Sequence, residues 1–344
     1  MQIENFTPWP HLVFERADTD DRRYAVVTLQ GCFSIPDGAP LVALDRQPGV
    51  VAADEYRGDP KTTSLLRAGV IATTKPQSDI TAEAVARSSQ PRAEWPVCLS
   101  VGSVASTLVV RGPHQWRHDD EEGWTRTEPT PCTEVPIVYE RAFGGAFTID
   151  DELVEEPRNP VGTGFLPDGL DDRAARPAPQ IVGMDEPEHE PGTSYAPRGW
   201  APLPAYFAPR RDHIGTADEH WRKTRWPRPP RDFSDAYYQC AHPDLIYPGY
   251  LRGDETIRID GVTHDERPIV TQLPGWCVFL LVRIEGGRMV LHPSRLDHLH
   301  LDVRSADRQD HRATLTWRAV LPKAPEIWRV EGRMTPMAAE GAAA

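Results

Sequence analysis

Short apolar runs, separated by turn-forming residues, dominate the first 146 residues of the chain. Residues 24–31 (YAVVTLQG) are rich in apolar and β-branched side chains, and two further runs of this kind are residues 95–101 and 107–111. Runs of this length and composition are typical of strands. The acidic segment 119–123 lies just after them and is typical of an exposed hairpin tip. The pattern therefore predicts a strand-rich N-terminal region.

The C-terminal part of the chain repeats this pattern. Residues 256–260 alternate between apolar and polar, and residues 276–284 form a nearly continuous apolar run, which predicts a strand buried on both faces. Gly286 and Gly287 follow that run and predict a hairpin turn into the next strand. Residues 312–320 are rich in Thr, Val and Trp, which again favours a strand.

The middle of the chain lacks a sustained period of either 2 or 3.6 residues. Residues 146–190 contain twelve acidic and three basic residues, whereas residues 198–231 contain eight Arg or Lys and three acidic residues. Thr216 and Glu219 have the spacing of a capping box, which predicts one short helix over residues 217–225. The rest of this region is predicted to be a long irregular connector.

These patterns predict an all-β, sandwich-type fold of antiparallel sheets, with a proline-rich connector and one short helix. Thirty-five prolines among 344 residues disfavour long helices. We expect an N-terminal β lobe at 1–146, an acidic and then basic connector at 147–232, a C-terminal β lobe at 233–322 and a disordered tail at 323–344. The two lobes either stand apart or form one domain.

Charge and cysteine content narrow the class of protein. The net charge of −13 disfavours a chain built as a whole to bind phosphate backbones. Five cysteines, odd in number and without a CxxC pair, predict free thiols in a reducing compartment. The N-terminal residues do not resemble a signal peptide, and no apolar run is long enough to span a bilayer. We therefore expect a cytoplasmic protein with no membrane contact.

No complete pattern for catalysis or ligand binding is present. The glycine-rich segments 143–145 and 161–164 lack the lysine of a phosphate-binding loop and are interpreted as tight turns. His298 and His300 would share one face of a strand, where they could bind a metal, although a solvated face is the favoured interpretation. We expect no catalytic residues, no metal and no cofactor. If the protein is an enzyme instead, residues 139–141 (YER) and Asn159 are the places to look.

The basic segment contains the most distinctive candidates for binding. Arginine, tryptophan and tyrosine contribute most of the energy of protein interfaces. The same residue types also stack on nucleic-acid bases, and arginine stems can simply cover buried aromatic rings while their charges pair with the preceding acidic segment. All three interpretations stay open for this segment. The candidate interaction residues are Trp200, Tyr206, Trp221, Arg222, Arg225, Trp226 and Phe233.

Seven strings in a fixed order resemble a known family over residues 6–320. They are residues 75–80 (KPQSDI), 109–116 (VVRGPHQW), 138–145 (VYERAFGG), 159–165 (NPVGTGF), 215–221 (GTADEHW), 226–233 (WPRPPRDF) and 251–255 (LRGDE). They resemble a domain-of-unknown-function family encoded beside type VI secretion genes. Eight residues within these strings are interpreted as a structural motif that supports the fold. They are Tyr139, Glu140, Arg141, Phe143, Gly144, Gly145, Asn159 and Gly162.

The resemblance implies that the protein binds other proteins. It supplies no catalytic residues. Members of the family are regarded as adaptors, or loading chaperones, that hold a secreted effector and deliver it to a PAAR-like or spike protein. The implied partners are therefore an effector and a spike component, with neither the effector nor the oligomeric state specified. The alternatives are an enzyme, such as a hydrolase or an effector-modifying enzyme, and a nucleic-acid-binding module.

Overall fold

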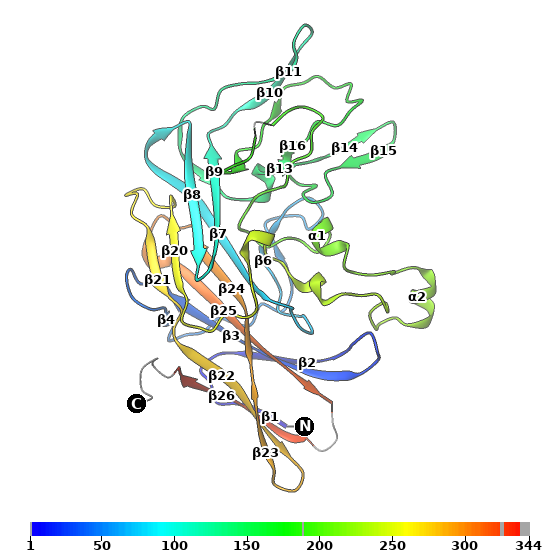
Figure 1. Ribbon diagram of the computed structural model, residues 1–344, viewed down its shortest axis with the longest axis vertical. Coiled ribbons are helices and arrows are strands. Elements are labelled where there is room, and N and C mark those ends of the chain that lie inside the picture. The colour runs from blue at the N-terminus through cyan, green and yellow to red at the C-terminus, as the bar shows by residue number, and fades with distance from the viewer. Residues whose placement is uncertain (1, 188, 324–326, 338–344) are drawn as a thin grey trace.

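A sheet of eight strands forms the centre of the computed structural model, which describes residues 2–187, 189–323 and 327–337. Six strands run in the order β12-β7-β24-β25-β3-β2, while β19 and β4 pair with β7 and β3 (Figure 1). Their bounds are β2 (His11–Ala17), β3 (Arg23–Ser34), β4 (Val42–Ala43), β7 (Ser78–Arg92), β12 (Cys132–Pro136), β19 (Ile246–Tyr247), β24 (Arg295–Val303) and β25 (Arg312–Pro322). The prediction of a β-dominated fold is confirmed.

Strands from both ends of the chain are neighbours in this central sheet. β25 pairs with β3 from Arg312 opposite Ser34 to Pro322 opposite Tyr24, and β24 pairs with β7. Of the two arrangements left open for residues 1–146 and 233–322, the structure has the second, in which both parts contribute strands to one sheet over one core. Trp9 and Trp317 stack in that core, with ring centroids 4.5 Å apart.

A second sheet of five strands shares the same hydrophobic core. Its order is β18-β9-β8-β20-β21, with the bounds β8 (Glu94–Val101), β9 (Val104–Arg111), β18 (Ile181–Gly183), β20 (Thr256–Asp260) and β21 (Ile269–Gln272). Its apolar positions alternate as the sequence predicts, so that Val97, Leu99 and Ile259 are all buried. One apolar face per strand is what a sheet needs when it packs on another sheet.

A third sheet has the order β1-β26-β22-β23 and contains the strand expected to be buried on both faces. Its bounds are β1 (Gln2–Asn5), β22 (Trp276–Ile284), β23 (Met289–Pro293) and β26 (Ile327–Pro336). In β22 only alternate residues, Val278, Leu280 and Val282, are buried, so the prediction of two buried faces is wrong. The predicted hairpin at Gly286 and Gly287 is confirmed.

The predicted disordered tail contains one of these strands. β26 pairs with β22 along its length and buries Val330. The prediction of a disordered tail at 323–344 is therefore wrong for residues 327–336, where long-range pairing supplies the order. The other parts of that tail, residues 324–326 and 338–344, lie outside the described residues.

The connector at 147–232 is made of short elements, most of them at the opposite end of the molecule from β26 (Figure 1). The remaining strands pair in twos and threes: β5 (Glu55–Tyr56), β6 (Leu65–Arg67), β10 (Gln115–Asp119), β11 (Gly123–Arg126), β13 (Phe143–Gly144), β14 (Ala146–Ile149), β15 (Glu152–Glu155), β16 (Thr163–Gly164) and β17 (Arg176–Pro177). The α-helices are α1 (Ala208–Arg211) and α2 (Glu219–Thr224), so the described residues contain one more helix than predicted.

The cysteines and the helices bear on two expectations from the sequence. All five cysteines are free, as predicted from their number and spacing. Within the described residues, no helix combines the length and the apolar character needed to cross a membrane.

A layer of polar side chains lies inside the central sheet. His298 and His300 are buried, and each has a ring nitrogen 2.9 Å from the Thr81 hydroxyl. The favoured interpretation of a solvated histidine face is wrong, because consecutive residues of β24 from Leu296 to Leu301 are buried, so both faces of the strand are covered. Burial lowers the pKa of both rings, that of His300 to about 4.

Removing β26 is predicted to destabilise the whole protein. A chain that stops after Lys323 leaves the apolar side of β22 without Val330 and Ile327. Burial of two such side chains contributes about 3–6 kcal/mol to the free energy of unfolding. Urea unfolding measures that loss. A chain that stops after Met337 keeps β26 and should unfold like the full chain; equal stability of the two truncations would contradict the role given to β26.

The buried histidines are predicted to make stability depend on pH. An unfolded histidine has a pKa of about 6.5, so between pH 7 and pH 5 the unfolded state takes up a proton that the folded state excludes. Acidification therefore favours unfolding, and one such histidine contributes about 2 kcal/mol to the difference between pH 7 and pH 5. In His300→Asn this difference should shrink by that amount. The exposed-site variant His213→Asn is the control, and unchanged pH dependence in His300→Asn would refute the assignment.

Candidate functional site

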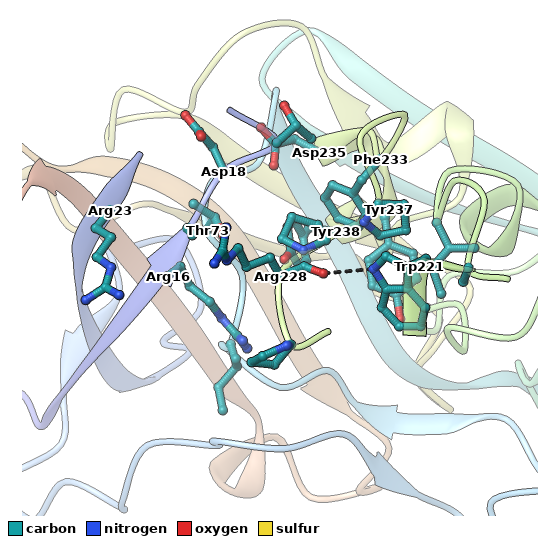
Figure 2. Close-up of a pocket in the computed structure, with 18 of the residues that line it drawn as sticks. Arg16, Asp18, Arg23, Thr73, Trp221, Arg228, Phe233, Asp235, Tyr237 and Tyr238 are labelled. Atoms are coloured by element: carbon teal, nitrogen blue, oxygen red, sulfur yellow. Dashed lines mark hydrogen bonds between the residues drawn. The ribbon is translucent and has the colours of Figure 1, made fainter. Parts of the chain in front are cut away.

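A cavity of about 640 Å³ lies between the β2–β3 hairpin and the segment that follows α1. We call it the hairpin groove. From the hairpin, Arg16 and Arg23 face it, and Figure 2 shows them across from the aromatic side chains of the second wall. That wall consists of Trp221, Pro227, Pro229, Pro230, Phe233, Tyr237 and Tyr238. The groove thus has one charged wall and one wall of rings.

Local hydrogen bonds fix the aromatic wall. The side chain of Asp218 caps α2 by accepting from the Trp221 backbone N–H at 2.7 Å. The Trp221 indole N–H then donates to the Arg228 carbonyl at 2.9 Å, which folds the proline-rich segment back over the helix (Figure 2). The predicted helix is confirmed, but its cap is Asp218. Thr216 instead donates its hydroxyl to Asp232 at 2.7 Å.

The rings beyond the prolines form a compact cluster. Phe233 lies 5.6 Å from Tyr237 and 5.5 Å from Tyr238, measured between ring centroids. Tyr237 and Tyr238 belong to the 3₁₀ turn η2 (Asp235–Tyr238). Edge-to-face and tilted ring contacts of this kind hold aromatic side chains in fixed orientations. The second wall is therefore preorganised before any partner binds.

The two walls of the groove are joined by one aspartate of the hairpin. Asp21 lies 3.2 Å from Arg225, 3.1 Å from Arg228 and 3.8 Å from Arg231, measured between side-chain oxygen and nitrogen atoms. Hydrogen bonding from Arg228 and the charge of the nearby arginines hold the pKa of Asp21 below its usual range. Arg225 also donates to the Thr19 carbonyl at 3.1 Å. The hairpin tip and the basic segment are thus tied by charge.

A second cavity of about 490 Å³ adjoins the hairpin groove at α2 and the proline-rich segment. Trp221, Arg228 and Pro230 line both cavities, and His220 and Arg231 belong to the second one. Trp221 is thus the one aromatic ring, among the described residues, that lines both of these cavities.

The structure separates the candidate interaction residues into two groups. Trp200 is fully buried and donates its indole N–H to the Ser106 hydroxyl at 3.2 Å, so its assignment to an interaction surface is wrong. Its apolar ring is part of the core, which no local pattern in the connector indicates. Tyr206 is half-buried and donates its hydroxyl to the Thr63 carbonyl at 3.1 Å, away from the groove.

The other candidates lie at or beside the hairpin groove. Trp221 and Phe233 line it, and Trp226 directly precedes Pro227 of the wall and is 60% exposed. Arg222 is exposed on α2, whereas Arg225 is largely covered and pairs with Asp21. The predicted pairing of the basic segment with the acidic segment is seen at Arg211 and Glu155, which are 3.4 Å apart.

Sequence reasoning missed the hairpin wall and the end of the aromatic wall. Arg16, Asp18 and Asp21 come from a strand and turn some 200 positions before the basic segment. Tyr237 and Tyr238 fall just beyond the boundary set at residue 233. One sequence signal could have indicated the hairpin wall. The turn at residues 18–21 is acidic and could pair with the closely spaced arginines at 225, 228 and 231.

The structural motif forms a tightly bonded turn region away from the groove. The Asn159 amide is buried and donates to the carbonyls of Tyr139 at 2.8 Å and Phe143 at 3.0 Å. Gly144 has φ +150°, and a Cβ there would lie 2.1 Å from the Asn159 carbonyl oxygen. A Cβ on Gly162 would lie 2.4 Å from the Asn159 side chain. These glycines are needed for close approach of backbone segments.

The residues considered for an enzyme site are engaged in contacts with the scaffold. Glu140 accepts hydrogen bonds from the Ser64 N–H at 2.7 Å and hydroxyl at 2.8 Å. Arg141 donates to the Gln180 side chain. Tyr139 is fully buried, and burial raises the pKa of its hydroxyl. In the described part of the chain, no group of three or more His, Cys, Asp or Glu side chains could hold a metal ion.

Comparison with known proteins identifies a family and no function. A family model described as "Uncharacterized protein conserved in bacteria (DUF2169)" matches residues 20–318. The chain belongs to this family. No curated protein and no solved structure matches it.

Proposed function

We propose that this member of the DUF2169 family is a cytoplasmic adaptor of bacterial type VI secretion. In this proposal it holds a secreted effector in the hairpin groove and delivers it to a PAAR-like or spike protein. The observation that carries the proposal is the groove itself, which has a rigid wall of aromatic and proline side chains facing a charged hairpin. The resemblance of seven ordered sequence strings to a secretion-associated family supplies the biological setting.

The chemistry of the two walls suits a polypeptide occupant. Grooves lined by aromatic and proline side chains bind extended peptides, since flat rings accept backbone and proline surfaces at low entropic cost. Arg16, Arg23 and Glu15 on the facing wall provide hydrogen-bonding partners for peptide groups. Because the wall is fixed by its own hydrogen bonds, little conformational entropy is lost on binding.

The surroundings of the groove suit a complex that must later dissociate. Trp226 and Arg222 are exposed beside it, where they can act as a few strong contacts within a polar rim. An interface of this type binds firmly and still releases, unlike the large apolar interfaces of obligate complexes. That balance is what loading and transfer of an effector require.

The paired arginines favour this proposal over nucleic-acid binding. Arg225, Arg228 and Arg231 are arranged around Asp21, which neutralises part of their charge. A surface that binds phosphates through counterion release depends on unpaired basic side chains. The aromatic side chains of the same segment face the groove and contact one another.

Replacing the exposed tryptophan is predicted to weaken effector binding. Trp226→Ala removes a ring that is 60% exposed, so the fold should be unaffected while the effector's affinity falls at least tenfold, as for an interface hot spot. The effector is first captured from the native cell with the tagged full chain and identified by mass spectrometry. Titration calorimetry with that effector then gives the affinity.

Two further variants sharpen this test. Trp328→Ala removes another exposed ring, which lies on β26 and does not line the groove, and this variant should bind like the wild type. The triple variant Trp221→Ala, Arg222→Ala, Trp226→Ala should lose binding further. Unchanged affinity in the folded triple variant would remove the hairpin groove as the binding surface. Failure of the full chain to retain any effector or spike protein would overturn the function.

A further inference from the structure

A cavity of about 430 Å³ adjoins the hairpin groove and is lined by charged side chains. Asp18, Thr73 and Asp235 line both cavities, so the two adjoin at these residues. Asp18 belongs to the hairpin and Asp235 begins the turn η2; Figure 2 shows both on one side of the groove. We call this space the side cavity. Its deeper wall comes from β24 and β25 of the central sheet.

The basic side chains of the side cavity already have partners. Arg318 donates to Asp297 Oδ2 at 2.5 Å and to the carbonyls of Val70 at 2.7 Å and Ala72 at 2.8 Å. Lys75 lies 2.6 Å from the buried carboxylate of Asp79, which is outside the cavity. The N–H donors of Arg318 and Lys75 are therefore largely engaged by other groups of the protein.

Arg295 is also engaged. It donates to the Tyr250 hydroxyl at 2.9 Å, and its guanidinium lies 4.6 Å from the centre of the Tyr250 ring. This stacked arrangement holds the guanidinium against the wall of the cavity.

The acceptors of the side cavity, in contrast, are incompletely satisfied. Asp297 is 1% exposed, and within the described residues its Oδ1 is buried without a hydrogen-bond partner. Buried polar atoms normally have partners, so such an oxygen indicates a missing donor. The half-buried carboxylate of Asp235 has no hydrogen bond or ion pair to any described residue, and burial together with the charge of Asp18 raises its pKa.

Asp18 differs from the other two carboxylates because it also supports the hairpin. It accepts from the backbone N–H groups of Asp20 and Arg22, both at 2.9 Å, and from the Tyr24 hydroxyl at 3.0 Å. These bonds fix its position beside Asp235. Both carboxylates line the side cavity, where their like charges repel and a cation would be stabilised.

We propose that the side cavity receives a lysine or arginine side chain of the polypeptide bound in the hairpin groove, with its cationic head between Asp18 and Asp235 and directed toward Asp297 Oδ1. This inference rests on the proposed function and names one feature of the partner. Pro293, Ala319 and Val320 line the same cavity and provide apolar surface for the methylene stem. The effector is therefore expected to present a basic residue within its docking segment.

Asp235→Asn is the most informative variant. It keeps the size of the side chain, removes the negative charge and breaks no hydrogen bond or ion pair in the described structure. Its thermal unfolding temperature should be no lower than that of the wild type, because a half-buried unpaired charge is removed. Asp45→Asn makes the same change of net charge at an exposed position and is the matched control.

The first measurement uses small probes and the full chain. N-acetyl-arginine amide and N-acetyl-lysine amide are titrated into the ¹⁵N-labelled protein, and N-acetyl-citrulline amide serves as the neutral analogue of the arginine probe. We expect saturable shifts of amide signals near Asp18 and Asp235 for the two cations and none for citrulline. Asp235→Asn should weaken both cations about tenfold, equivalent to about 1.4 kcal/mol, while Asp45→Asn should not. Equal binding of citrulline, or no saturable binding of either cation, would overturn the cation site.

The second measurement uses the effector captured with the full chain. If its basic side chain occupies the side cavity, Asp235→Asn weakens the complex about tenfold, as it does for the probes. Wild-type affinity of the Asp235→Asn variant would overturn this inference while the adaptor function stands. Failure of the function itself is read separately, from the full chain retaining no effector or spike protein.

Discussion

The groove depends on one buried carboxylate, that of Asp79 in β7. Asp79 accepts hydrogen bonds from Lys75 and Gln239, both at 2.6 Å, and from the backbone N–H groups of Cys240 at 3.0 Å and Ala241 at 3.2 Å. A buried charge is tolerated only when it is paired and fully hydrogen-bonded, and then its partners are held in place. Residues 239–241 directly follow η2, so the central sheet fixes the end of the aromatic wall through this carboxylate.

The opposite wall, formed by the β2–β3 hairpin, is held by ion pairs. One acidic residue of the hairpin, Asp21, pairs with several arginines of the connector. Asp21 has φ +68°, which turns the hairpin tip toward the arginines that surround it. The groove therefore lies between two segments that are far apart in sequence and joined by charge at the surface. The deep anchor at Asp79 supplies rigidity, whereas the contact at Asp21 is partly exposed to solvent and is therefore weakened more by salt.

The strings that carry the family resemblance fall into two structural classes. Lys75 and Asp79 of the first string, and Asn159 of a later one, are buried and bind backbone or side-chain groups of the scaffold. The strings at residues 215–221 and 226–233 instead form the wall of the hairpin groove. The resemblance thus extends beyond the framework to the surface that we propose binds an effector.

The sequence by itself determined the β-dominated class, several strands, the glycine turns and the helix near residue 220, because these follow from local periodicity and backbone preference. Only the tertiary structure decided which strands pair, since β3 and β25 meet across almost the whole chain and hydrogen-bonding partners at that separation leave no local pattern. For the same reason it alone buried Trp200, His298 and His300 and ordered β26. Likewise, the basic aromatic segment could be recognised from composition, but its acidic partner on the hairpin could not, because a charge identifies no particular counterion until folding places the two side by side.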